Sequence, residues 1–529
     1  MQAWDTVIVG GSVAGLRAAI AAADGGSSVT VLSPSHPSST CDDSIVSGIS
    51  ASVGEINSST HSMDTQRIGA SLCENDIVTS TTGSAVAIVA ELERWGLNLR
   101  RLRTGMPHLG QLPGQSNPRT ASTGDSTLRE TRQILEEQCI KRNIPRRGDI
   151  EVLDLVIHRG KACGLVALDT QTGEIFGIQS KSIILAGSGF QSAWNGDRFA
   201  MGTAGALALR AGISLADLEF NSMHPLTVAD TDYAIPLDVL GSGGEVLGSD
   251  GQPMSTEDGP DSLALSIVRG GGASLDLTNV SREDMPWFGT ITEILSSRCG
   301  VDATMQLIPL MPRTNSTIGG IPTNNQGQVI RSDWNTILHG LFAAGDAACS
   351  GLHGASLNSG DQLLGALTSG KISGEYAAEY AAKAKHSASS EISVAVTDAH
   401  HAHDAMLSGS EDESVQASAV RSSLANTMRT HMGAERDASG LSLAASSIAK
   451  LQNLPLMISD SNPVMNTELV DTIRTQNLLA VSAAAVSAAI SREETRGNHI
   501  RTDFPETSDS PSHSLSHEDG TTSNLSMRS

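Results

Sequence analysis

The sequence of 529 residues predicts an α/β protein that opens with a dinucleotide-binding unit. Residues 6–9 (Thr-Val-Ile-Val) are expected to form a buried strand, residues 10–15 (Gly-Gly-Ser-Val-Ala-Gly) a tight turn and residues 16–23 a helix, followed by a strand over 28–32. This order is typical of a Rossmann-type unit, in which backbone N–H groups and a helix N-terminus bind a pyrophosphate. A dinucleotide site is therefore expected at the turn.

Later apolar runs extend this sheet. Residues 151–158, 162–168 and 177–183 predict a β-meander inserted in the nucleotide domain, and residues 182–186 and 340–344 predict two short strands. The last two are followed directly by glycine. Glycines at the carboxyl ends of strands are expected at a ligand site, because α/β sheets bind ligands there.

The remaining chain divides by composition. Short strands and glycine-rich turns between about 220 and 321 predict a second, inserted domain, and the Ala- and Ser-rich segment from about 375 predicts helices. The apolar run 478–490 is shorter than the roughly 20 residues that span a bilayer and is interpreted as a buried helix. The predicted units are 1–219 with 322–376, 220–321, 377–506, and a disordered tail over 507–529.

Charge and cysteine content exclude several classes of protein. The chain has 35 Lys+Arg and 58 Asp+Glu, a net charge of -23, which disfavours binding to nucleic acid. Its six cysteines form no C-x-x-C pair, which argues against a zinc ribbon or a resident iron–sulfur cluster. His400, His401, His403 and Asp404 fall in a predicted polar connector, for which a solvated linker is favoured over a metal site. No metal site is predicted, and the start of the sequence shows no export signal, so a cytoplasmic location is expected.

A series of collinear motifs covers nearly all of residues 5–506. They are His61-x-x-Asp64-Thr65, Leu92-Glu93-Arg94-Trp95-Gly96, Gly114-Gln115-Ser116 with Arg119-Thr120, His224-Pro225, Gly319-Gly320-Ile321-Pro322-Thr323, Ala343-Ala344-Gly345-Asp346, His353-Gly354-Ala355, and Arg492-Glu493-Glu494-Thr495-Arg496-Gly497-Asn498-His499. Together they resemble the flavoprotein subunits of succinate dehydrogenase and fumarate reductase.

The resemblance implies a fold and a reaction. The expected fold is a Rossmann-type FAD-binding domain with an inserted α+β capping domain and a C-terminal helical region. Members of this family oxidise or reduce a carbon–carbon bond of a small carboxylic acid, with hydride passing to or from FAD, which carries the redox chemistry. An iron–sulfur subunit is the expected electron partner, and membrane association is expected only through partner subunits, on the inner face of the cell membrane.

The resemblance also indicates where FAD would bind. The family's anchoring histidine corresponds to Cys41, so a noncovalent FAD is favoured over a thioether link. Ser33 stands where many dinucleotide sites place an acid on the ribose. The predicted cofactor contacts are Gly10, Gly11, Ser12, Val13, Ala14, Gly15, Ser33, Thr40, Cys41, Ser47, Gly48, Ala186, Gly187, Gly189, Gly345, Asp346, Gln362 and Leu363.

The family's substrate-binding cations are largely missing from this sequence. Leu357 stands where the family has a carboxylate-binding arginine, and Asn315 stands for a histidine. The position of the proton-donor arginine falls near Leu265 and Ser266, with Arg269 as the nearest substitute, and the proton relay falls near Leu237 and Leu240. Only His224 is retained. The candidate catalytic residues are therefore His224, Asn315 and Arg269.

Three functions remain open on the sequence alone. The first is an FAD-dependent oxidoreductase that acts on a small carboxylic acid and passes electrons to an iron–sulfur partner. The second is a catalytically silent flavoprotein subunit, which the lost cations favour. The third is an enzyme similar to L-aspartate oxidase, whose pocket normally keeps the same cations.

Overall fold

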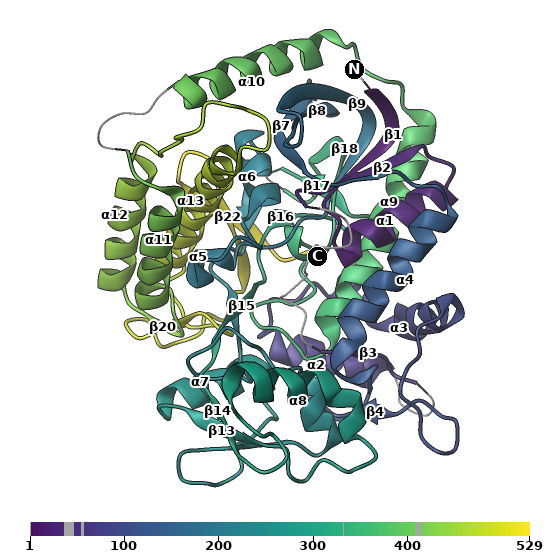
Figure 1. Cartoon of the computed structure of the whole chain (residues 1–529), viewed down its shortest axis with the longest axis vertical. Coiled ribbons are helices and arrows are strands. Elements are labelled where there is room, and N and C mark those ends of the chain that lie inside the picture. Colours follow the sequence, from purple (N-terminus) through teal and green to yellow (C-terminus); the bar gives the residue numbers. More distant parts are fainter. Residues whose placement is uncertain (1, 36–46, 54–57, 332, 409–413, 529) are drawn as a thin grey trace.

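The computed structural model describes residues 2–35, 47–53, 58–331, 333–408 and 414–528. Thr40 and Cys41, two of the predicted cofactor contacts, lie outside the described residues. The predicted α/β fold with a C-terminal helical region is confirmed, with a mixed sheet in the upper part and an inserted unit at the lower end of Figure 1.

The central sheet has the order β17-β18-β8-β9-β1-β2-β6, with β7 paired to β8. Strand β1 (Gln2–Val9) is parallel to β2 (Val29–Leu32) and to β9 (Glu174–Leu185), and β18 (Ile337–Ala343) is parallel to β9. Strands β6 (Arg146–Arg147) and β17 (Gln328–Ile330) form its edges. The parallel strands end together at Val9, Leu32, Leu185 and Ala343, so their carboxyl ends share one edge of the sheet.

The predicted β-meander is present as β7 (Ile150–His158), β8 (Lys161–Asp169) and β9. The runs 177–183 and 182–186, predicted as separate strands, form the single strand β9 because no turn residue separates them. Its first half pairs antiparallel with β8, and its second half runs parallel to β1 and β18. Strand β9 thereby joins the meander to the nucleotide-binding edge.

Two helices pack closely against the sheet and each other. Helix α1 (Val13–Asp24) contacts α9 (Asp361–Lys383) through glycine: a Cβ on Gly370 would lie 2.4 Å from the Ala14 carbonyl oxygen, and one on Gly374 would lie 2.3 Å from that of Ala18. Helix α4 (Thr127–Lys141) packs against α1, and α3 (Asn75–Trp95) contacts both α9 and α2 (Ser58–Ile68) (Figure 1). Small residues therefore set how closely α1 and α9 approach.

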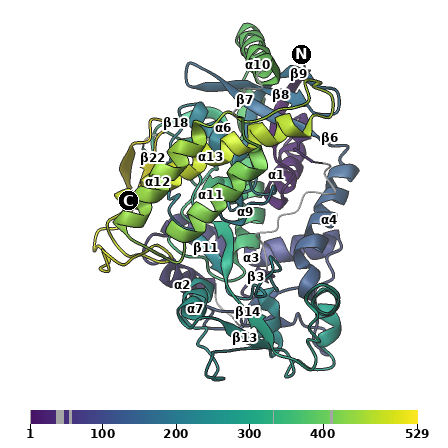
Figure 2. The same cartoon turned by 60° about the vertical axis from the view of Figure 1, so that its left-hand side comes forward.

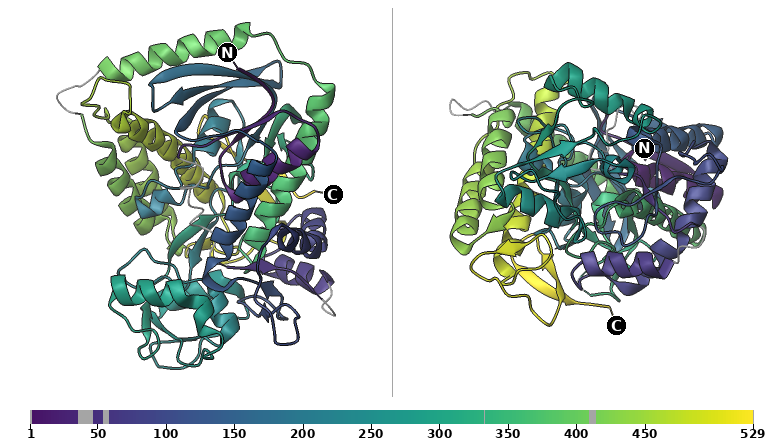
Figure 3. Two further views of the ribbon diagram at one scale, coloured as in Figure 1. Left: turned by 45° about the vertical axis from the view of Figure 1, so that its right-hand side comes forward. Right: turned by 90° about the horizontal axis from the view of Figure 1, so that it is seen from below.

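The inserted unit, called the cap below, has its own core. It lies between β11 (Asn221–His224) and β15 (Arg313–Thr317), which pair antiparallel. It contains a three-stranded sheet and two helices around a buried core. These elements are β12 (Glu245–Leu247), β13 (Ala273–Asp276), β14 (Ile308–Leu310), α7 (Gly259–Arg269) and α8 (Gly289–Ile294). Figure 3 shows the cap below the sheet domain, joined to it through β11 and β15.

The C-terminal part is helical, with α11 (Ala417–His431), α12 (Ala438–Gln452) and α13 (Thr467–Ser491) packed side by side (Figure 2). Helix α13 is apolar and long enough to cross a membrane by length and composition, but 67% of its most apolar window is buried inside the protein. This agrees with its interpretation as a buried helix.

Helix α10 (Ser390–Ser408) crosses the β-meander and contains the histidine group. The prediction of a polar connector there is wrong, because His403 turns into the interior of a continuous helix while His400 and His401 face outward. Within the described part of the chain, no group of three or more His, Cys, Asp or Glu side chains is placed to hold a metal ion.

The predicted disordered tail is also wrong where it is described. Strands β22 (Ser512–Ser516) and β23 (Thr522–Ser526) form a hairpin, and β22 pairs with β10 (Leu215–Ala216). His513 explains this order: its Nδ1 lies 2.5 Å from Asp217 and its Nε2 3.0 Å from Glu74. Charge pairs with distant residues stabilise a segment that has little apolar surface of its own.

The hairpin's stability is expected to depend on pH through His513. Burial by itself lowers the pKa of His513, but Asp217 and Glu74 outweigh it and raise the pKa from 6.5 to about 9. A raised histidine pKa stabilises the folded state fully below pH 6.5, and this contribution is lost as the pH rises through 9. His513→Gln is therefore expected to cost about 3 kcal/mol of unfolding free energy at pH 6 and much less above pH 9.5.

Thermal unfolding followed from pH 6 to 10 measures this difference. His517→Gln is the control, because His517 lies on the same hairpin but its ring bonds the Ser214 and Ser523 hydroxyls rather than a carboxylate. An equal loss of Tm at both ends of the pH range for His513→Gln would show that the charge pairs contribute nothing.

Candidate functional site

The turn between β1 and α1 is held in place by Ser12. Its hydroxyl donates to the Ala186 carbonyl (2.7 Å) and accepts from the Gly15 N–H (3.2 Å), so it caps α1 and ties the turn to the end of β9. Serine is a good N-cap residue because its oxygen satisfies one free N–H of the first helical turn. The departure from a second glycine therefore preserves the shape of the turn.

Glycine is required on both sides of Ser12. Gly10 has φ +116°, and a Cβ there would lie 2.3 Å from the Ala186 oxygen. A Cβ on Gly15 would lie 2.1 Å from the Gly10 oxygen. These contacts explain the Gly-x-Ser-x-x-Gly spacing and leave the N-terminus of α1 open toward a ligand.

A cavity of about 260 Å³ adjoins this turn. It is lined by the predicted contacts Gly10, Gly11, Ser12, Ser33, Ala186 and Gly187, and by Glu151, Arg198, Phe199 and Arg474, which were not predicted. The Ser33 hydroxyl is buried and has no hydrogen-bond partner among the described residues. A ligand hydroxyl at this point would satisfy it.

An acid lies beside Ser33 on the neighbouring strand. Glu151, on β7, accepts a hydrogen bond of 2.8 Å from the Arg474 Nε. Burial raises the pKa of Glu151, and the adjacent Arg474 guanidinium opposes that rise. Glu151 lies close to Ser33 because the N–H of the preceding residue, Ile150, donates to the Ser33 carbonyl.

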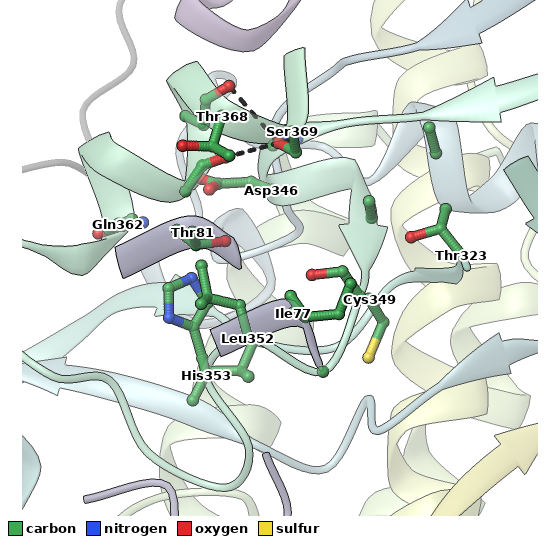
Figure 4. Close-up of a pocket in the computed structure, with 18 of the residues that line it drawn as sticks. Ile77, Thr81, Thr323, Asp346, Cys349, Leu352, His353, Gln362, Thr368 and Ser369 are labelled. Atoms are coloured by element: carbon green, nitrogen blue, oxygen red, sulfur yellow. Dashed lines mark hydrogen bonds between the residues drawn. The ribbon is translucent and has the colours of Figure 1, made fainter. Parts of the chain in front are cut away.

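A second cavity, of about 60 Å³, lies between the C-terminal end of β18 and the N-terminal end of α9 (Figure 4). The predicted contacts Gly345, Asp346 and Gln362 line it, together with Leu357. Figure 4 shows Thr368 and His353 among its lining side chains; the Thr368 hydroxyl and the His353 Nδ1 are buried without a hydrogen-bond partner among the described residues. Gly345 lies against Ala14 at the start of α1, so both cavities adjoin the same turn.

Family models match most of the chain. The model described as "FAD binding domain" matches residues 5–363, and the model described as "Fumarate reductase flavoprotein C-term" matches residues 421–528. The chain belongs to the FAD-binding family of the succinate dehydrogenase and fumarate reductase flavoproteins. It is an FAD-dependent oxidoreductase by family, which confirms the resemblance and the cofactor expected from the sequence.

Individual relatives agree with this assignment. The chain is 27% identical to the succinate dehydrogenase flavoprotein subunit of Rickettsia bellii, over 96% of this chain and 91% of the relative, and 28% identical to the fumarate reductase flavoprotein subunit of Haemophilus influenzae, over 96% and 90%. Its structure matches the FrdA chain of E. coli quinol fumarate reductase with a TM-score of 0.92 and 24% identity, over 100% of this chain and 97% of that one. That structural match concerns the fold.

Both cavities adjoin the α1 turn and are lined in part by the predicted FAD contacts. The turn between them offers backbone N–H groups of α1, and the unpartnered Ser33 and Thr368 hydroxyls lie in the two cavities. Val13, Ala14 and Leu363 are buried in the core beside the turn, whereas a Cβ on Gly189 would meet the Thr317 hydroxyl. These four predicted contacts therefore pack around the turn and line neither cavity.

The predicted catalytic residues do not come together. His224 is buried, its Nε2 lies 2.7 Å from the Ile235 carbonyl oxygen, and burial lowers its pKa to about 4. Arg269 lies at the end of α7 with 56% of its side chain exposed, and it pairs with Glu435 at 2.7 Å. Asn315 lies on β15 between Thr314 and Ser316. Neither Arg269 nor Asn315 lines the two cavities.

Two buried cap carboxylates were missed by the sequence argument. Asp238 follows Leu237 and accepts hydrogen bonds from the Gly48 N–H to both its oxygens, at 3.0 and 3.3 Å. Asp261, in the first turn of α7, accepts from Ser222 (2.6 Å) and Ser356 (2.6 Å). In the sequence, the two acids stand out only because Asp238 follows Leu237 and Asp261 is close to Leu265, where proton-transfer residues were expected. Their hydrogen-bond partners are distant in the chain, so the sequence gives no further indication of them.

Substitution at Gly10 tests the FAD turn. Gly10→Ala places a methyl group against the Ala186 carbonyl at a positive φ, a strain of about 2 kcal/mol. FAD affinity is expected to fall at least about tenfold. Flavin absorbance per chain after gel filtration, followed by titration of the flavin-free protein with FAD, measures the effect.

Gly83→Ala is the matched control for Gly10→Ala. Gly83 lies within α3, where an added Cβ meets no atom within 4 Å. Normal flavin content in Gly10→Ala would show that FAD does not lie against this turn.

Proposed function

We propose that this protein is the flavoprotein component of an oxidoreductase, which binds FAD noncovalently across the two cavities and acts on a small organic substrate held between the cap and the FAD domain. The observation that carries the proposal is the α1 turn, which adjoins two cavities that contain the unpartnered hydroxyls of Ser33 and Thr368. When bound, FAD accepts or delivers the hydride. The chain's own residues bind FAD, orient the substrate and exclude water.

The electrons are proposed to pass to a separate iron–sulfur protein. The five described cysteines (Cys73, Cys139, Cys163, Cys299 and Cys349) are scattered, and no metal-binding group is found in the described part of the chain. The relatives are named as subunits, which supports a partner of this kind. Any membrane location would then be peripheral and through that partner.

The small carboxylic acid expected from the resemblance finds little support in the geometry. Leu357 packs among Leu72, Phe220, Ile318 and Ala355 and supplies no charge. His224 is neutral at physiological pH, because its pKa is lowered to about 4. Two carboxylates need cations to hold them, so a dicarboxylate is a poor ligand for this site.

A catalytically silent flavoprotein is the second candidate, and the same missing cations favour it. The L-aspartate oxidase alternative needs those cations as well and gains nothing from the structure. The silent and the active protein differ in one measurable respect, which is whether any substrate reduces or reoxidises the bound flavin.

The purified protein is expected to carry FAD that acid precipitation releases into the supernatant. Cys41 is not a histidine, so a noncovalent cofactor is favoured, and Cys41→Ser should leave flavin content unchanged. Absorbance between 350 and 500 nm and fluorescence of the acid pellet measure both points. A fluorescent pellet from the native protein but not from Cys41→Ser would contradict the noncovalent proposal, and a colourless native protein would contradict FAD binding itself.

A further inference from the structure

One wall of the cavity at the end of β2 comes from the C-terminal helical region. Arg474, in α13, lines this cavity together with the turn before α1 and with Ser33. Helix α13 also packs against α6 (Thr203–Arg210), whose first residues line the same cavity (Figure 1). The cavity therefore lies between the FAD domain and the C-terminal helical region, although the two are far apart in the sequence.

Arg474 holds two parts of the FAD domain at once. Its Nε donates to the Glu151 Oε1 at 2.8 Å, its Nη2 donates to the same oxygen, and Nη2 also donates to the Pro34 carbonyl at 3.1 Å. Glu151 is the second residue of β7, and Pro34 follows Ser33 just after β2. A guanidinium is planar and carries several N–H donors in fixed directions, so this one side chain fixes the positions of both segments.

This bonding leaves one oxygen of Glu151 available on the cavity wall. Both bonds from Arg474 go to Oε1, and no described residue donates to Oε2. Glu151 is only 1% exposed, yet it lines the cavity. The Ser33 hydroxyl lines the same cavity and is buried without a hydrogen-bond partner among the described residues. The wall thus presents a carboxylate oxygen and a hydroxyl to a ligand that carries hydroxyl groups.

The end of β2 is the part of a dinucleotide site that meets the adenosine ribose. In a Rossmann-type unit the pyrophosphate lies at the turn before the first helix, and a side chain after the second strand bonds the ribose hydroxyls. Ser33 offers only a hydroxyl there, and the hydrogen bond of 3.0 Å from the Ile150 N–H to the Ser33 carbonyl places Glu151 beside it. A carboxylate accepts a stronger hydrogen bond from a hydroxyl than a neutral oxygen does.

Helix α13 contacts the cavity wall at a second point, one turn before Arg474. Asp471 pairs with Arg198, which lines the cavity, at 3.0 Å, and with Arg421 of α11 at 3.2 Å. Both Arg474 and Asp471 therefore join the helical region to side chains of the cavity wall. A ligand that binds this wall also favours the docked position of α13, because binding stabilises the state to which the ligand binds.

We propose that the C-terminal helical region is part of the FAD site. Glu151 accepts a hydrogen bond from a hydroxyl of the adenosine ribose, and Arg474 is the positioning residue that holds Glu151 and the Pro34 carbonyl in place. FAD binding and the docking of α13 then stabilise each other by the same free energy. This inference rests on the proposed function and concerns the adenosine end of the cofactor rather than its redox-active ring.

The test compares FAD with its dideoxyadenosine analogue, whose adenosine ribose lacks both hydroxyl groups. Isothermal titration calorimetry on the flavin-free, full-length protein measures both dissociation constants without turnover. The native protein is expected to bind FAD at least about tenfold more tightly than the analogue. In Glu151→Gln this ratio is expected to fall to about threefold or less, because an amide whose oxygen faces Arg474 presents its NH₂ group to the cavity.

Asp154→Asn is the matched control for Glu151→Gln. Asp154 lies on the same strand and pairs with Arg210 at 3.1 Å, but it is half exposed and lines neither cavity, so the ratio should be unchanged. An equal loss of affinity for FAD and the analogue in Glu151→Gln would overturn the inference, because it would show an ion pair that only supports the structure. Equal binding of both ligands by the native protein would also overturn it. A native protein that binds neither ligand would contradict the proposed function itself.

Amide hydrogen exchange of residues 467–491, with and without FAD, tests the coupling to α13. FAD is expected to slow exchange in the first half of α13 in the native protein, and to slow it much less in Arg474→Gln. Arg474→Gln is also expected to bind FAD at least about tenfold more weakly. Exchange in native α13 that FAD leaves unchanged would overturn the coupling. If Arg474→Gln fails to fold, the native protein with and without FAD still decides it.

Discussion

Close backbone packing around the first turn is the constraint on which the rest of the structure depends. Gly10 lies against Ala186 at the end of β9, Gly345 lies against Ala14, and Gly370 of α9 also meets Ala14. Three segments far apart in the sequence therefore meet at the start of α1. Since interiors are close-packed, a single methyl group at any of these glycines would separate the sheet end from the helices and change the shape of both cavities.

The same arrangement explains how charge is distributed. The FAD domain ends its parallel strands at one edge, and the antiparallel pair β11 and β15 joins the cap to that domain. Away from the site, buried carboxylates find cations: Glu219 pairs with Arg492, and Asp217 with His513. At the site, Asp238 and Asp261 find only uncharged donors. Burial raises the pKa of both carboxyl groups, and the hydrogen bonds that they accept oppose that rise.

The sequence predicted those parts of the fold that depend on local pattern. The strand, turn and first helix follow from the apolar run over 6–9 and the glycines after it, and the β-meander follows from three apolar runs with turns between them. The C-terminal hairpin was missed, because residues 512–516 are polar and His513 is ordered by Asp217 and Glu74, about 300 and 440 positions away. Composition reports local apolar content and contains no information about such pairs.

Of the candidate site, only the residues expected to bind the cofactor could be predicted from the sequence. The cradle for a pyrophosphate depends on consecutive residues, whereas a substrate pocket depends on which side chains the cap brings to the loop before α9. The uncharged residues Leu357 and Asn315 could be read from the sequence by resemblance to the family; the hydrogen bond of Asp238 with the Gly48 N–H could not, because 190 positions separate the two residues. A missing cation weakens the binding of an acid, and Asp238 already occupies the backbone donor of Gly48, so neither feature favours a dicarboxylate at this loop.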